Sequence, residues 1–192
     1  MTTHDAPRTD LLAALDRAIA GTDRLIAGID AHQWSAPTPC TEWDVRALVT
    51  HVTSGMFNFA ALVRGEPRPD HAADHLAGDP VVAYHSAATT MRAAFAAPGA
   101  LDRIYSSPIG PAPGSVLVHL RITELLVHGW DLARATGQRV DLPVDLAAGE
   151  LAVWRAQFRE GLPDALPFAP ARPVAAHAPA IDQLAAFLGR SV

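Results

Sequence analysis

The stretch that decides the fold is RITELLVHGWDLARATG, residues Arg121–Gly137. Its apolar residues recur at helical spacing, and the glycine at its end favours the end of a helix. Glu124 and His128 are four positions apart, so their side chains lie on one face of this helix. Two ionisable groups among apolar neighbours need a partner, because burying an unpaired charge is costly. A divalent metal ion is one such partner; spacing alone equally allows an ion pair of Glu124 with Arg121 and a packed His128.

A metal site needs a third ligand from elsewhere in the chain, and His51 is the best candidate. It lies within a predicted helix, where its alternative role is that of a core histidine. His119 is five residues before Glu124, about 140° round a helix of 3.6 residues per turn, and is expected in a second shell or at the surface. Two imidazoles and one carboxylate suit zinc and other divalent first-row metals. Three protein ligands leave room for a water molecule or a thiol, and the spacing does not choose between these two.

Three further residues, Trp130, Asp131 and Cys40, have a packing or ion-pairing role and, in some cases, a chemical alternative. Trp130 is expected in the core. Asp131 either forms an i, i+3 ion pair with Arg134 or accepts the N–H of a metal-bound histidine. Cys40, the one cysteine, excludes an intramolecular disulfide and precedes a predicted helix, whose N-terminus can lower a thiol pKa; packing is its expected role.

The composition favours helices and excludes several classes of function. Of the 192 residues 49% are hydrophobic but only 6% are aromatic, which disfavours strands. The net charge is −5 and no basic run occurs, which argues against binding to nucleic acid or to an anionic membrane surface. No secretory signal and no apolar stretch of about 20 residues is found. These features predict a cytoplasmic protein, either monomeric or dimeric.

The order of predicted elements indicates an all-α, four-helix bundle with an extra short C-terminal helix, in a single domain over residues 1–192. A Pro- and Ala-rich tail is expected from about residue 161, before the closing helix IDQLAAFLGR. Thr41, Asp79 and Ser115 are the predicted N-caps of three helices. Residues 101–114 are expected to be irregular or a short extended pair. The five longer helices are predicted at about 9–28, 42–64, 79–97, 115–137 and 144–160.

Two segments carry a resemblance to a known family. WSAPTPCTEWDVRALVTHV (34–52) and ITELLVHGWDLARATG (122–137) resemble the DinB-like metal-binding domain of mycothiol-dependent maleylpyruvate isomerases, most closely its short actinobacterial members. The resemblance implies a metal inside the bundle, held at the positions of His51, Glu124 and His128. It implies zinc, with nickel possible, and mycothiol or a similar low-molecular-weight thiol that the metal activates. A small electrophile is the implied substrate.

One departure from the family limits what the resemblance implies. The full-length isomerases carry a second, sterol-carrier-like domain that contributes to the active site, whereas only residues 138–192 follow the motif helix here. Maleylpyruvate isomerisation therefore does not follow from the resemblance. The leading hypothesis is a metal-dependent thiol S-transferase or isomerase. The alternatives are a metal-dependent hydrolase that uses a metal-bound water, and a non-enzymatic metal- or ligand-binding domain.

Overall fold

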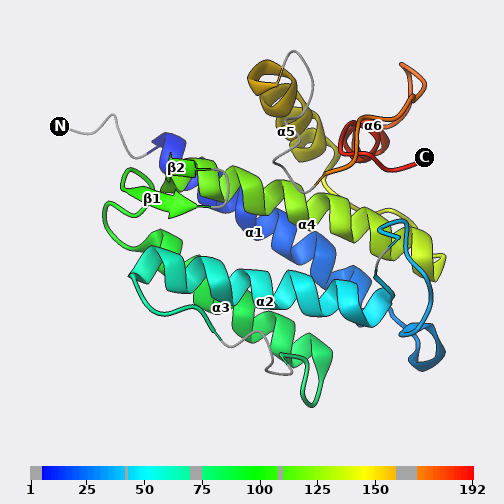
Figure 1. The fold of residues 1–192 in the computed structure, drawn as a ribbon, viewed down its shortest axis with the longest axis horizontal. Helices are drawn as coiled ribbons and strands as arrows, with labels where there is room; N and C mark the ends of the chain where they lie inside the picture. Colours follow the sequence, from blue (N-terminus) through cyan, green and yellow to red (C-terminus); the bar gives the residue numbers. More distant parts are fainter. Residues whose placement is uncertain (1–5, 42, 70–74, 108–109, 159–167) are drawn as a thin grey trace.

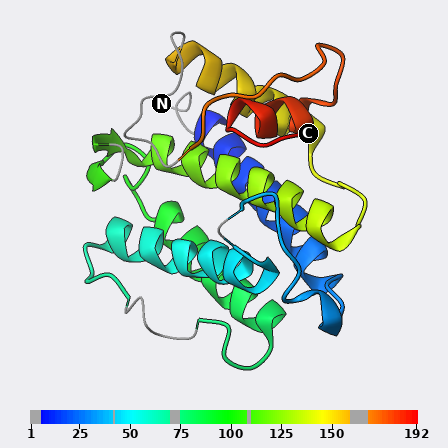
Figure 2. The same cartoon turned by 45° about the vertical axis from the view of Figure 1, so that its right-hand side comes forward.

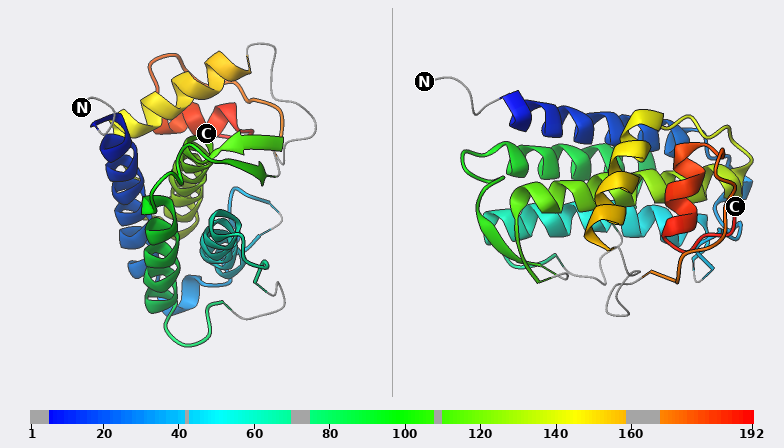
Figure 3. Two further views of the ribbon diagram at one scale, coloured as in Figure 1. Left: turned by 90° about the vertical axis from the view of Figure 1, so that its left-hand side faces the viewer. Right: turned by 90° about the horizontal axis from the view of Figure 1, so that it is seen from above.

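The computed structural model, which describes residues 6–41, 43–69, 75–107, 110–158 and 168–192, is built around a bundle of four helices (Figure 1). Helices α1 and α4 run in one direction and α2 and α3 in the other. A view along their axes shows that α1 and α2 each lie beside both α3 and α4 (Figure 3). The predicted all-α four-helix bundle is therefore confirmed. The helices are α1 (Ala6–Ala27), α2 (Val45–Arg64), α3 (Pro80–Ala96) and α4 (Gly114–Thr136).

The interior of the bundle is filled by the apolar stripes that the sequence shows at helical spacing. Each large side chain that is removed from water in this way stabilises the fold by roughly 1.5–3 kcal/mol. Fully buried examples from α1 to α4 are Leu15, Ile26, Leu48, Met56, Tyr84, Phe95, Leu117, Leu125 and Leu126.

Two further helices, α5 (Val144–Gln157) and α6 (Ala180–Phe187), cover the side of α4 that faces away from α2 and α3 (Figure 2). Helix α4 is consequently enclosed on most sides, which explains why its sequence is apolar beyond a single stripe. The chain also has a short 3-10 turn, η1 (Ala31–Gln33). None of the described helices has the length and apolar character needed to cross a membrane.

The structure tests several predictions about connections. Strands β1 (Ile104–Ser107) and β2 (Gly110–Pro113) pair in an antiparallel hairpin, as the expected extended pair. The predicted end of the fifth helix and the start of the tail fall at residues 159–167, which lie outside the described residues. Residues 168–179 run without helix or strand, and the backbone N–H of Arg172 donates to the carbonyl of Ala186 in α6 (2.8 Å).

Two predicted N-caps are wrong. Helix α2 begins after Asp44, whose side chain accepts from the backbone N–H of Ala47 (2.8 Å), and not after Thr41. The reason is tertiary: the backbone N–H of Val45 already donates to the carbonyl of Ala36 in the preceding connector (3.0 Å). Ser115 lies inside α4, because its backbone N–H donates to the carbonyl of Leu101 (2.8 Å) and needs no side-chain cap.

Three helix ends agree with the sequence. Asp79 caps α3 through its side chain, and α2 and α4 each end at a glycine in the left-handed conformation, Gly65 (φ 72°) and Gly137 (φ 68°). Glycine is favoured there because it has no Cβ to clash with the backbone. These ends follow from local chemistry, so they could be predicted without knowledge of the tertiary contacts.

Candidate metal centre

Two histidines from different helices meet where the first half of α2 packs against the second half of α4. The ring centroids of His51 on α2 and His128 on α4 are 5.1 Å apart, with the rings inclined at 79°. Trp43, just before α2, lies against both of them, at 4.3 Å from His51 and 5.8 Å from His128. His128 is 6% exposed. Residues far apart in the sequence thus form one cluster of two imidazoles and an indole.

Asp131 orients His128. Oδ2 of Asp131 lies 3.1 Å from Nδ1 of His128, and the carboxylate is fully buried. An ionised carboxylate only accepts hydrogen bonds, so Nδ1 of His128 carries a proton. In the neutral ring this tautomer leaves the lone pair on Nε2, the atom that a ligand would use. Of the two interpretations of Asp131, the pairing with Arg134 is wrong: Arg134 lies 3.7 Å from Asp182 in α6. Asp131 accepts instead from Arg190, through Nη2 at 2.9 Å.

Glu124, the predicted carboxylate ligand, is paired with Arg121 on the same helix. The guanidinium of Arg121 is buried, also donates to the carbonyl of Val52 (3.2 Å), and lies over the ring of Phe59 (5.2 Å). Gly55 leaves room for it, since a Cβ there would lie 2.8 Å from Nη1 of Arg121. The ion pair of Glu124 with Arg121, which helical spacing allowed as an alternative to a metal, is therefore present. Because a carboxylate has two oxygens and about four lone pairs, this pairing leaves acceptor capacity on Glu124.

The electrostatics of the cluster favour an incoming cation. Burial, together with the electrostatic effect of His128, lowers the pKa of His51 from 6.5 to about 4, against the opposing effect of Glu124. Burial also raises the pKa of Glu124, but the charge and the hydrogen bond of Arg121, with smaller electrostatic effects of His51 and His128, outweigh burial and hold that pKa below its usual value. At neutral pH His51 is thus neutral and Glu124 is ionised, which are the protonation states that metal ligation requires.

The depressed pKa of His51 predicts a pH-dependent stability in the metal-free protein. Below about pH 6.5 the unfolded chain binds a proton at this imidazole, whereas the folded chain does so only near pH 4. Acidification therefore favours the unfolded state, by about 2 kcal/mol between roughly pH 7.5 and pH 5. Urea unfolding in the presence of a chelator measures this effect.

The matched variant for this prediction is His51→Gln, which removes the titrating group. Other histidines titrate in the same range, so the quantity of interest is the difference in unfolding free energy between wild type and variant. That difference should change by about 2 kcal/mol over this pH range. A difference that stays constant with pH would show that the pKa of His51 is not depressed.

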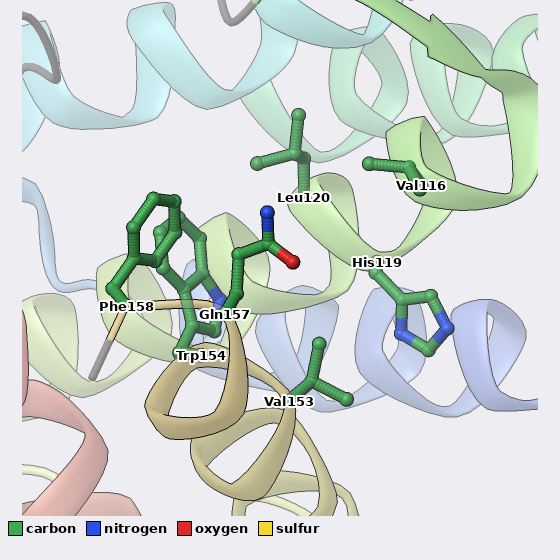
Figure 4. A pocket seen from close by; sticks show the side chains of 7 residues that line it. All are labelled: Val116, His119, Leu120, Val153, Trp154, Gln157 and Phe158. Carbon is green, nitrogen blue, oxygen red and sulfur yellow. The ribbon is translucent and has the colours of Figure 1, made fainter.

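His119 lies away from the cluster, on the side of α4 that faces α5. Its Nδ1 is 2.8 Å from Oε1 of Glu150, a buried carboxylate that also accepts from Thr123 (3.0 Å). Figure 4 shows His119 at the edge of a cavity of about 170 Å³ between α4 and α5, with Trp154 among the other lining residues. This placement does not support a second-shell role for His119. His119 and Glu124 lie on different sides of α4 because they are about 140° apart around the helix.

A wider, more open cavity of about 470 Å³ lies over His51. Its walls combine the indole of Trp43 with polar side chains, and they come from the start of α2 and from the loop before α3. They are Trp43, Asp44, Arg46, Ala47, Thr50, His51, Ser54 and His75. This cavity gives a small molecule access to His51, whereas His128 is not among its lining residues.

Sequence reasoning missed two residues of this site, Trp43 and Arg190. Trp43 lies in the segment that carries the resemblance, but nothing in its spacing indicates a contact with two histidines. Arg190 follows the last helix, where a basic residue is ordinarily a solvated one; here it is 8% exposed. Both contacts join segments distant in the sequence, so no local pattern signals them.

These features define a helical-bundle protein with a histidine pair and an ionised carboxylate between α2 and α4. Residues 15–133 match the mycothiol maleylpyruvate isomerase N-terminal domain family, and the chain belongs to this family. The resemblance noted from the two motifs is thereby confirmed.

Two proteins of similar sequence and two solved structures resemble this chain. The uncharacterized proteins MT0763 (strain CDC 1551 / Oshkosh) and Rv0738 (strain ATCC 25618 / H37Rv) of Mycobacterium tuberculosis are each 40% identical over 187 residues, 95% of this chain and 99% of theirs. The crystal structure of the mycothiol-dependent maleylpyruvate isomerase is 18% identical, with a TM-score of 0.59 over 82% of this chain and 75% of that one. A histidine-to-alanine mutant of that enzyme gives 0.60 at the same identity and coverage. At this identity the likeness shows a shared fold.

Proposed function

We propose that this protein holds a divalent metal ion, zinc foremost and nickel as an alternative, through His51, Glu124 and His128. We further propose that it transfers or isomerises a small electrophile with the help of mycothiol or a similar low-molecular-weight thiol. One observation carries the proposal: the imidazoles of His51 on α2 and His128 on α4 have ring centroids 5.1 Å apart, and the ionised Glu124 is close enough to affect the pKa of His51. Membership in the mycothiol-linked family supports the choice of thiol.

The chemistry of the donor set fits such an ion. One neutral imidazole, a second whose Nδ1 proton is held by Asp131, and one carboxylate are the ligands that zinc prefers when it keeps an open position. Among the described residues no group of three or more His, Cys, Asp or Glu side chains has a metal-binding arrangement. The proposal therefore includes an adjustment of the side chain of Glu124, which would share its carboxylate between Arg121 and the ion. When bound, the metal would lower the pKa of a thiol so that it is a thiolate at neutral pH.

The chain's own residues supply orientation and shielding. Asp131 and Arg190 fix the ring of His128, while Arg121 holds Glu124 in its ionised state. The indole of Trp43 covers the two imidazoles on one side and limits the access of water to them. The cavity over His51, about 470 Å³, is in the range of small-ligand sites and is lined by hydroxyl and charged groups suited to a polar thiol.

The test compares thiol consumption by metal-loaded and metal-stripped protein in the presence of a small electrophile such as a maleate derivative. We expect zinc-dependent turnover with mycothiol, and slower turnover with a thiol that lacks its sugar groups. Equal rates with and without metal would contradict the proposal. Turnover of an ester without any thiol would replace it with the hydrolase alternative.

A further inference from the structure

We propose that Arg190, in the segment after α6, is a positioning residue of the candidate metal centre. By clamping the carboxylate of Asp131, it keeps that carboxylate where it accepts the Nδ1 proton of His128, so that Nε2 faces its ligand as a lone-pair donor. This inference rests on the proposed function, and it identifies the C-terminal segment as part of the site.

Among the described residues, Arg190 and His128 hold the carboxylate of Asp131. Nε of Arg190 lies 3.2 Å from Oδ1 and Nη2 lies 2.9 Å from Oδ2, a two-point contact that fixes the plane of the carboxylate. The remaining contact comes from Nδ1 of His128, 3.1 Å from Oδ2. Asp131 is fully buried and Arg190 is 8% exposed, so water competes little for these hydrogen bonds. The orientation of the imidazole thus depends on how the guanidinium holds the carboxylate.

The end of α6 is built to direct this guanidinium back toward α4. Gly189 adopts φ 89°, and a Cβ there would lie 2.6 Å from the carbonyl oxygen of Ala169, so the turn requires glycine. The backbone N–H of Arg190 donates to the carbonyl of Ala185 (3.0 Å), and its Nη1 donates to the carbonyl of Leu188 (3.1 Å). The guanidinium is therefore held before any ligand arrives.

Anchoring α6 to the bundle does not require this buried ion pair. Asp182 in α6 already accepts from Nε1 of Trp130 (2.7 Å) and lies near Arg134, whose guanidinium stacks over the same indole (5.0 Å). A buried ion pair often stabilises a fold no more than an apolar pair of similar size, because of its desolvation cost. Orienting a histidine is a task that an apolar pair cannot perform.

The experiment compares Arg190→Gln with Arg134→Gln, a control that weakens the same α4–α6 contact without touching Asp131. Zinc affinity is measured by competition with a chelator, and folding by circular dichroism and urea unfolding. We expect Arg190→Gln to weaken zinc binding by about 10-fold, the lower end of the effect of outer-shell partners, and Arg134→Gln to leave it unchanged. Arg190→Lys, which keeps the charge but not the two-point contact, should fall between wild type and Arg190→Gln. Equal affinity in wild type and Arg190→Gln would overturn the proposal.

A double-mutant cycle shows whether Arg190 acts through Asp131. Asp131→Asn should weaken zinc binding, and adding Arg190→Gln to it should have no further effect, because the carboxylate that Arg190 holds is gone. Fully additive effects would overturn the inference. The double variant removes both charges of the buried pair and so leaves no charge unpaired. If Arg190→Gln alone fails to fold, the comparison of the double variant with Asp131→Asn still shows whether Arg190 acts through Asp131.

A readout without metal separates this inference from the proposed function. In the metal-free protein, the ¹⁵N chemical shifts of His128 should report one tautomer, with the proton on Nδ1, in wild type and in Arg134→Gln. In Arg190→Gln they should report a mixture of tautomers. Failure of the wild type to bind zinc would end the proposed function alone, whereas identical tautomers in all three proteins would overturn the role of Arg190.

Discussion

Replacing His128 with alanine is expected to lower the affinity for zinc by more than about 100-fold, beyond the 10- to 100-fold loss typical of outer-shell partners. The reason is that a two-ligand site holds zinc poorly, and that His128 is the proposed ligand whose orientation is most firmly held, through Asp131 and Arg190. Elemental analysis of the purified proteins, followed by chelator competition, measures the effect. His51→Ala should show a loss of similar size.

The loss of folding stability in His128→Ala should be moderate, about 1–3 kcal/mol, because Asp131 keeps its contact with Arg190. His119→Ala is the matched control: it removes a histidine from the same helix on the side that faces α5. We expect that variant to bind zinc as the wild type does. Loss of zinc in His119→Ala, or full retention in His128→Ala, would reassign the ligands. A wild type that holds no metal and unfolds when His128 is replaced would show that this residue serves packing alone.

Replacing Arg121 with methionine is expected to reduce the free energy of unfolding by about 3 kcal/mol, the lower end of the cost of breaking a buried ion pair. Methionine retains much of the apolar stem, so the loss reports the guanidinium, which pairs with Glu124 and donates to the carbonyl of Val52. The side chain of Glu124 is 25% exposed, and this partial solvation is why the lower end applies. Urea unfolding in the presence of a chelator measures the change.

The double variant Arg121→Met with Glu124→Gln is the control, because it removes the unpaired charge as well. We expect it to recover most of the lost stability. Equal losses in the single and double variants would show that the loss comes from the other contacts of Arg121, such as its hydrogen bond to Val52, and not from the unpaired charge of Glu124. Zinc in excess should reduce the deficit of Arg121→Met, since an ion that binds Glu124 in the folded state neutralises the same charge and stabilises that state. A deficit that zinc leaves unchanged would argue against ligation by Glu124.

The parts of the fold that could be predicted are those governed by local chemistry. The apolar periodicity of α1 to α4, the side-chain cap at Asp79 and the glycine ends at Gly65 and Gly137 each depend on residues within a turn or two. The N-caps expected at Thr41 and Ser115 were wrong because carbonyls of the preceding connectors, at Ala36 and Leu101, already accept from the backbone N–H groups of Val45 and Ser115. A capping pattern cannot show that another segment supplies the acceptor.

In the candidate site, too, contacts within one helix could be predicted and contacts between distant segments could not. Spacing on α4 placed Glu124, His128 and Asp131 on related faces of one helix, and the contact between Asp131 and His128 is of this local kind. The distance between His51 and His128 depends on how α2 packs against α4, and the contacts of Trp43 and Arg190 depend on where a connector and the chain end lie.

For this protein, the order of residues along the chain was sufficient for a helical bundle, for the family and for the carboxylate and imidazole one turn apart on α4, because helix periodicity and capping act over a few residues. Only the tertiary structure decided that His51 meets His128, that Arg121 pairs with Glu124, and that a C-terminal arginine holds Asp131. The contacts of His51 with His128 and of Arg190 with Asp131 join side chains that become neighbours only when the chain packs. The pair of Arg121 with Glu124 is one of several that helical spacing allows equally, and packing selects it.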